Sequence, residues 1–249
     1  MTPIMRQILL SGKKNYIGIR HTAGTFNFGI TNGADVLWVF PDGTSSTAAQ
    51  PNVAVPAGVT KLYASNLSAS GVQLTDGNSD AIVTSQLRDF NKLTHSLDLT
   101  SCTNVTGSLA DLQGKLTYFL SLYNCRNITG SLADLQGKLT GSLTLDNCAN
   151  VTGSLADLQG KLTSTLNLNK CASITGVYTP VGAGTPSTTI LSNTGLSSAD
   201  IDNTLIAYAA ATKNNGTFTA TGMTRTAASD AAVATLGTRG WTILGITKV

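Results

Sequence analysis

The sequence carries little charge and contains no long apolar run. Only 12% of its 249 residues are charged, against about 25% in ordinary globular chains. The 16 Lys and Arg residues are scattered and are nearly balanced by 13 acidic residues. We therefore expect no basic groove for phosphate groups, and nucleic acid is excluded as a partner. No apolar stretch approaches the roughly 18 residues of a membrane span, which excludes insertion into a bilayer.

Small neutral polar residues take the place of charge. The chain contains 37 Thr, 22 Ser and 18 Asn, a composition typical of an extracellular surface. Its 41% hydrophobic content and net charge of +3 argue against disorder. The first 14 residues nevertheless lack the apolar stretch of about 7–15 residues that marks a secretory signal. We therefore expect a protein that folds in a cytoplasm and is later exposed outside the cell.

A 23-residue repeat is the main signal in the sequence. Its unit reads Leu-x-Leu-x-x-Cys-x-x-(Val/Ile)-Thr-Gly-x-Leu-x-x-Leu-x-x-x-Leu, and segments 104–117, 127–140 and 150–163 differ only at their second residue. The alternating leucines predict a short strand with both side chains inward. The Thr-Gly pair predicts a turn, and the later leucines predict a short helical or irregular return segment. One unit cannot bury its own apolar side, so the units are expected to stack with their strands in a parallel sheet.

This pattern resembles the leucine-rich repeat family, in versions with Cys at the position often taken by Asn. The resemblance is clearest over residues 96–176. It implies an α/β fold, namely a right-handed solenoid with a parallel sheet on one face. Residues 86–94 echo the return segment, with Leu87, Phe90 and Leu93 at its apolar positions.

The predicted organisation has three parts. Residues 1–60 are expected to form a small β-rich unit of short strands and turns, which caps or anchors the chain. Residues 61–188 are expected to form the solenoid, with early strands at 61–64 and 72–74. Residues 189–249 are expected to form an α/β cap.

The spacing of apolar residues in the carboxy-terminal part predicts longer units whose return segments are α-helices. Ser197 or Ser198 is expected to begin a helix over residues 199–212. A second helix is expected over residues 227–236. The strands around these helices are expected to place three apolar residues at equivalent positions, namely Leu191, Phe218 and Ile243.

Evenly spaced cysteines invite a metal or disulfide interpretation. Zinc sites use close Cys pairs, whereas these cysteines are 23 residues apart and the chain has only two His. Parallel side chains on stacked units also suit a disulfide poorly. We therefore predict buried free thiols, which fit a chain folded in a reducing cytoplasm. The cysteines are Cys102, Cys125, Cys148 and Cys171.

A second ladder consists of Asp residues, each followed by Lys four residues later. Neighbouring carboxylates could suggest a glycosidase pair, but acid–base chemistry needs two carboxylates in different environments, and identical units supply identical ones. We therefore predict repeated charge pairs, and we expect no catalytic residue, metal or cofactor. The pairs are Asp111/Lys115, Asp134/Lys138 and Asp157/Lys161.

The copies diverge at the positions that flank the two leucines of each strand. Period-two geometry predicts that these positions are exposed, and the second copy places aromatic residues and Arg there, which are favoured binding anchors. Unconstrained variation in a recently duplicated repeat is the alternative explanation. The candidate binding face consists of Phe119, Ser121, Tyr123, Arg126, Thr144, Asp146, Asn167 and Asn169.

A virion component would combine the extracellular composition with reduced cysteines and no export signal. The repeat and the segments 191–205 and 235–243 are similar to segments of bacteriophage tail and fibre proteins and of bacterial surface repeat proteins. The resemblance implies a non-enzymatic structural protein at a tail, fibre or capsid surface. Its expected partner is a protein or glycan on a host surface or a neighbouring virion protein, and homo-oligomer formation stays open. The alternatives are a bacterial cell-surface or secreted adhesin and a carbohydrate-degrading enzyme.

Overall fold

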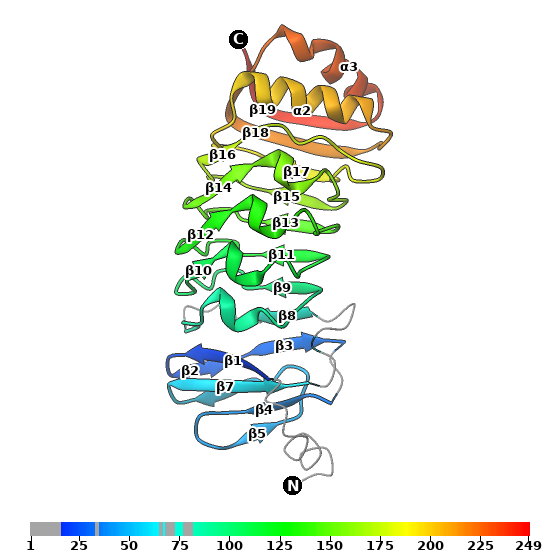
Figure 1. Cartoon of the computed structure of the whole chain (residues 1–249). Coiled ribbons are helices and arrows are strands. Elements are labelled where there is room, and N and C mark those ends of the chain that lie inside the picture. The colour runs from blue at the N-terminus through cyan, green and yellow to red at the C-terminus, as the bar shows by residue number, and fades with distance from the viewer. Residues whose placement is uncertain (1–15, 33–34, 65–66, 68–72, 77–81) are drawn as a thin grey trace.

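The computed structural model describes residues 16–32, 35–64, 67, 73–76 and 82–249. Over these residues the chain is mostly strand with few helices, and many of its strands run parallel. The α/β class is confirmed at this level. Figure 1 shows an elongated molecule with the amino-terminal strands at one end and two helices at the other. Two parts of the sequence analysis concern residues outside the described ones. They are residues 1–14, which lack the pattern of a secretory signal, and part of the strand predicted at 72–74.

The amino-terminal part is built from antiparallel strands. One sheet has the order β1-β7-β4-β5, and a separate pair joins β2 to β6. Trp38 is fully buried against Phe26, with the ring centroids 5.5 Å apart. The strands are β1 (Tyr16–His21), β2 (Gly24–Phe26), β4 (Leu37–Val39), β5 (Ser45–Ser46), β6 (Val53–Val55) and β7 (Gly58–Tyr63).

The prediction that residues 61–64 begin the repeats is wrong. These residues lie largely in β7, which pairs antiparallel with both β1 and β4. Thr60 and Leu62 alternate inward from β7 and are fully buried in this amino-terminal part. The Lys-Leu-Tyr-Ala sequence therefore has the alternation of a strand but belongs to a different sheet.

A nine-stranded sheet runs along the rest of the molecule, in the order β19-β18-β17-β15-β13-β11-β9-β8-β3. From β8 to β19 each strand is parallel to the next, and only β3 is antiparallel to its neighbour. The first leucine of each repeat is in register with the next, and all are buried. We number repeats one to four from β9 (Ser96–Asp98), β11 (Phe119–Ser121), β13 (Ser142–Thr144) and β15 (Thr165–Asn167). The remaining strands are β3 (Phe28–Thr31), β8 (Gln73–Asp76), β17 (Thr188–Ile190), β18 (Gly216–Arg225) and β19 (Trp241–Lys248).

A second parallel sheet replaces the predicted Thr-Gly turn. It has the order β10-β12-β14-β16, so each repeat contributes one strand to each of two sheets. The glycine of this segment permits the close approach of neighbouring repeats. At Gly130, φ is +102°, and an added Cβ would lie 2.5 Å from Ser108 Oγ of the previous repeat. The strands are β10 (Gly107–Ser108), β12 (Ile128–Ser131), β14 (Val151–Ser154) and β16 (Ser173–Thr175).

The return segments contain short 3₁₀ helices, as the spacing of the leucines predicted. Each begins with a capping box, in which the residue before the helix and the Asp three residues later satisfy each other's backbone N–H groups. Leu87, Phe90 and Leu93 are buried, which confirms residues 86–94 as an earlier copy. The helices are η1 (Leu87–Phe90), η2 (Leu109–Leu112), η3 (Leu132–Leu135) and η4 (Leu155–Leu158).

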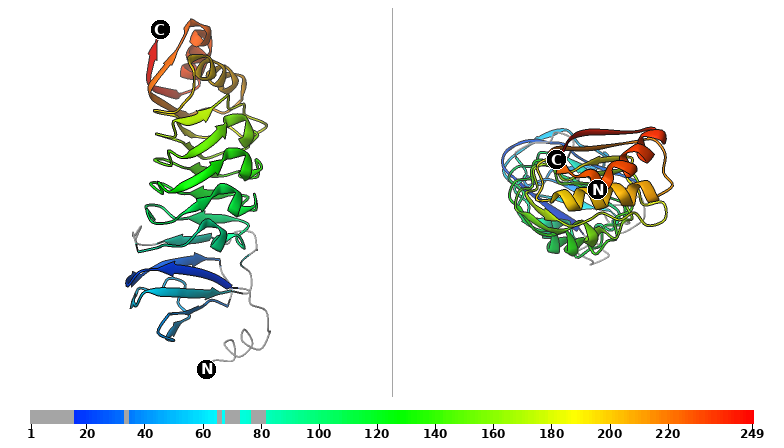
Figure 2. Two further views of the ribbon diagram at one scale, coloured as in Figure 1. Left: turned by 60° about the vertical axis from the view of Figure 1, so that its left-hand side comes forward. Right: turned by 90° about the horizontal axis from the view of Figure 1, so that it is seen from above.

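At the carboxy-terminal end, α-helices take the place of the short 3₁₀ helices. Helix α2 (Ser198–Ala210) has Ser197 as its N-cap, and η5 (Ala227–Ser229) leads into α3 (Asp230–Thr238). Both predicted helices are thereby confirmed. They contact each other as well as β18 and β19, and Figure 2 shows them on one side of these strands.

The predicted equivalence of Leu191 with Phe218 is wrong. Phe218 is in register with Thr189, and Ile243 is in register with Phe218. Thr189 occupies a fully buried position equivalent to that of Leu166, where its hydroxyl bonds the buried Tyr208 hydroxyl at 2.8 Å. A threonine at a leucine position is tolerated because α2 brings it this polar partner.

Candidate binding surface

The divergent residues of the repeats lie in the strands of the large sheet or in the turns that directly follow them. In repeat two, Phe119 is half-buried, Tyr123 is 39% exposed and Arg126 is exposed. Arg126 Nε donates to Asn124 Oδ1 at 3.0 Å, which restrains the guanidinium beside the sheet. Tyr123 and Arg126 are therefore exposed and Phe119 is partly exposed, so all three divergent side chains of repeat two reach the surface. We call Phe119, Tyr123 and Arg126 the repeat-two surface.

Ser121 does not belong to the exposed surface, so its predicted exposure is wrong. Its exposed fraction is 4%, and its hydroxyl bonds Thr100 Oγ1 at 2.8 Å. Asp98 and Thr144 are its register partners on the two neighbouring strands. A small side chain between in-register neighbours about 4.8 Å away is covered although it points outward.

The candidates in repeats three and four form a polar ladder. Asn169 Nδ2 donates to Asp146 Oδ1 at 3.1 Å, and the Asn169 backbone N–H donates to Asn167 Oδ1 at 3.1 Å. These three side chains and Thr144 are half-buried. The ladder links neighbouring strands, so repeat two presents the larger exposed groups on this part of the sheet.

The rings of His95 and Tyr118 stack just before strands β9 and β11, a contact that the sequence analysis did not predict. Tyr118 is 48% exposed, and its ring lies parallel to that of His95, with the centroids 5.1 Å apart. Gly141 takes the same position in repeat three, where an added Cβ would lie 2.8 Å from the Tyr118 ring. Comparing the copies one residue before Phe119 would have revealed this exchange of ring for glycine.

The four cysteines form the predicted ladder of buried free thiols. Each is fully buried in the apolar core. Cys148 Sγ donates to Leu122 O at 3.0 Å, and Cys171 Sγ donates to Leu145 O at 3.0 Å. Burial raises the pKa of Cys171 to about 12. All four thiols therefore lack the exposure of reactive cysteines, and Cys171 also lacks their low pKa.

The predicted Asp/Lys pairing is wrong. Asp134 Oδ2 accepts from the Ser131 backbone N–H at 2.8 Å, and the other two Asp residues of the ladder make the same bond. Among the described residues, both ion pairs involve Asp230 instead. The helix η3 ends at Leu135, and Gln136 adopts a left-handed conformation with φ of +54°. Lys138 therefore lies beyond the helix, where the i, i+4 rule no longer applies.

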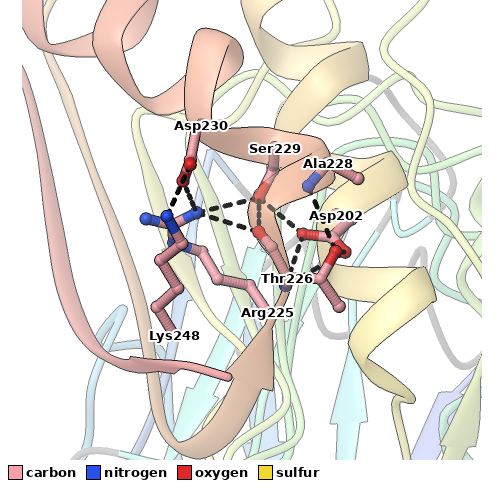
Figure 3. Close-up of polar contacts among 7 residues, drawn as sticks. All are labelled: Asp202, Arg225, Thr226, Ala228, Ser229, Asp230 and Lys248. Atoms are coloured by element: carbon pink, nitrogen blue, oxygen red, sulfur yellow. Dashed lines mark hydrogen bonds and ion pairs between the residues drawn. The ribbon is translucent and has the colours of Figure 1, made fainter.

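A polar cluster near the carboxy-terminal end joins the two helices (Figure 3). Asp202 of α2 is 4% exposed and accepts from Thr226 Oγ1 at 2.6 Å and Ser229 Oγ at 2.5 Å. Burial raises the pKa of Asp202, but these hydrogen bonds and the nearby Arg225 outweigh it and hold the pKa below its usual range. Arg225 also pairs with Asp230 at 2.6 Å. Every carboxylate here has a partner, which is the pattern of a structural cluster.

The described part of the chain contains no group of three or more His, Cys, Asp or Glu side chains that could hold a metal ion. It also contains no helix with the length and apolarity needed to cross a membrane. Comparison with known proteins finds no matching family model, curated protein or solved structure.

Proposed function

We propose that this chain is a non-enzymatic structural and binding protein of a bacteriophage virion, located at a tail, fibre or capsid surface. In this proposal, its repeats form a right-handed solenoid of the leucine-rich repeat type. The parallel, in-register strands that recur every 23 residues support that architecture. Buried free thiols beneath a coat of Thr, Ser and Asn support folding in a reducing cytoplasm before exposure outside.

The repeat-two surface is the observation that carries a binding role. Phe119, Tyr123 and Arg126 stand on a frame whose return segments are copied almost without change. Rigid aromatic residues and Arg supply much of the binding energy at protein surfaces. The ligand in this proposal is a host-surface polymer or a neighbouring virion protein.

Substitutions taken from the other repeats test this surface with little risk to the fold. Phe119→Ser, Tyr123→Asn and Arg126→Ala copy Ser142, Asn169 and Ala149, which occupy the same positions elsewhere. We call the combined change the repeat-two variant. It should melt like the parent chain but lose binding to host cells or to purified virion proteins. Unchanged binding to both would contradict the binding role of this surface.

Localisation tests the virion role separately. Antibodies against the chain should label particles from a lysate of the source culture in immunogold electron microscopy. The alternative is a bacterial surface or secreted adhesin, for which the same exposed surface would serve. Labelling of uninfected cell envelopes without labelling of particles would support that alternative and contradict the virion role.

A further inference from the structure

Repeat four departs from the copied frame in its return segment. The repeat keeps its length, since Leu166 and Thr189 are in register, but residues 177–187 replace the capped 3₁₀ helix. Val181, at the position of the buried Leu158, is 61% exposed. The next return segment contains the α-helix α2 in place of a 3₁₀ helix. The packing between neighbouring return segments therefore changes at residues 177–187.

A cavity of about 370 Å³ lies where the frame changes. The hydroxyl of Tyr178 fixes its loop, because it accepts from the Leu162 backbone N–H at 2.9 Å and donates to Gly184 O at 3.0 Å. A volume of this size is at the lower end for small-molecule sites. The lining residues are Thr163, Gly182, Ala183, Thr185, Thr212 and Lys213.

Lys213 places a positive charge at this cavity. Its Nζ donates to Thr163 O at 2.7 Å and to Thr185 O at 2.8 Å, so two repeats hold the ammonium in place. Neutral carbonyl groups accept these bonds but leave the charge uncompensated. Among the described residues, the ion pairs do not include Lys213. Burial lowers the pKa of Lys213, as expected for a cation without a neutralising carboxylate.

We propose that this cavity binds a carboxylate-bearing sugar, such as a uronic acid unit of a glycan. The carboxylate would accept the third proton of Lys213 Nζ, and the threonine-lined walls would face the sugar hydroxyls. A charge-assisted bond of this kind is stronger than a neutral one and favours an acidic sugar over a neutral one. The inference rests on the cavity and Lys213, and it does not depend on the repeat-two surface.

Titration with sodium glucuronate, followed by ¹H–¹⁵N correlation spectra of the full chain, tests the proposal. Saturable shifts should be confined to residues around Gly182, Ala183 and Lys213, with glucose and acetate binding more weakly. Lys213→Gln should weaken glucuronate binding by about tenfold or more, whereas Lys213→Arg should retain it. Lys170→Gln removes an exposed lysine elsewhere and serves as the matched control.

Two results would overturn the proposal. One is an absence of saturable shifts in the folded parent chain, and the other is equal binding by the parent and a folded Lys213→Gln variant. If Lys213→Gln lowers the melting temperature, the Lys213→Arg and glucose comparisons still decide the question. The repeat-two variant should bind glucuronate normally, so failure of this proposal and failure of the proposed function are distinguishable.

Discussion

Replacing Asp134 with Ala tests whether the copied Asp residues cap their helices or pair with lysine. Asp134 accepts from the Ser131 backbone N–H at 2.8 Å, and Ser131 Oγ accepts from the Ala133 backbone N–H at 3.2 Å. The bond to Asp134 is half of the capping box of η3, whose other half joins the Ser131 side chain to the Asp134 backbone N–H. Lys138 contributes nothing to it. We therefore expect Asp134→Ala to be costly and Lys138→Ala to be nearly neutral.

The magnitude follows from the bonds that are lost. Removing a helix cap costs about 0.5–2 kcal/mol, and an ionised acceptor with a part-buried donor places Asp134→Ala in the upper half of this range. Asp134→Asn keeps an acceptor oxygen and should cost roughly half as much. Lys138→Ala should stay within about 0.5 kcal/mol of the parent chain.

Urea unfolding followed by far-UV circular dichroism measures these differences. The parent chain, Asp134→Ala, Lys138→Ala and the Asp134→Ala/Lys138→Ala double variant form a cycle that isolates any interaction between the two side chains. Capping predicts additive effects. A loss for Lys138→Ala equal to that for Asp134→Ala, with a coupling above about 0.5 kcal/mol, would refute the capping explanation and restore the ion pair.

Other predictions concern the core and the carboxy-terminal cluster. Asp202→Ala should destabilise the chain by about 2–4 kcal/mol at pH 7 in urea unfolding; because the folded pKa of Asp202 lies below 3.8, this difference should shrink as the pH falls through it. Gly130→Ala should lower the melting temperature, since φ is +102° there, whereas Gly237→Ala, with open space around its added Cβ, should not. All four thiols should resist a thiol reagent in the native protein and react in denaturant; fast native labelling would contradict their burial.

The repeat made much of the fold predictable. Strict spacing identified the buried leucines, the cysteine ladder, the short return helices and the earlier copy at 86–94, because the positions required for burial recur in every copy. The helix after Ser197 was also predictable from its cap. Local patterns suffice where the same few residues decide both local conformation and packing.

The predictions that were wrong depend on contacts between residues far apart in the sequence, which local residue spacing does not reveal. The sequence shows Leu62 in an alternating strand, but not that β7 joins an antiparallel sheet. The Thr-Gly segment looked like a turn because its pairing partner is another copy of itself. Ser121 looked exposed because local spacing does not show that Thr100 of the neighbouring repeat covers and bonds its hydroxyl. Each error required knowledge of which distant residues lie side by side.

The candidate binding surface was only partly predictable for the same reason. Divergence between copies identified Phe119, Tyr123 and Arg126, and in the structure the first is partly exposed and the other two are exposed. It did not identify the stack of Tyr118 on His95, which needs the register of β9 and β11. The cavity at Lys213 could not be predicted from the sequence, because residues 177–187 and the segment after α2 form it together.

The most direct test of the proposed binding role is the dissociation constant of the repeat-two variant for immobilised host-surface material, measured beside the parent chain. Lys138→Ala, a charge removal on the return segment, serves as the control. We expect at least about tenfold weaker binding for the repeat-two variant, because hot-spot residues each contribute about 2 kcal/mol or more. The control should bind like the parent. Equal dissociation constants for the folded repeat-two variant and the parent would contradict a binding role for the repeat-two surface.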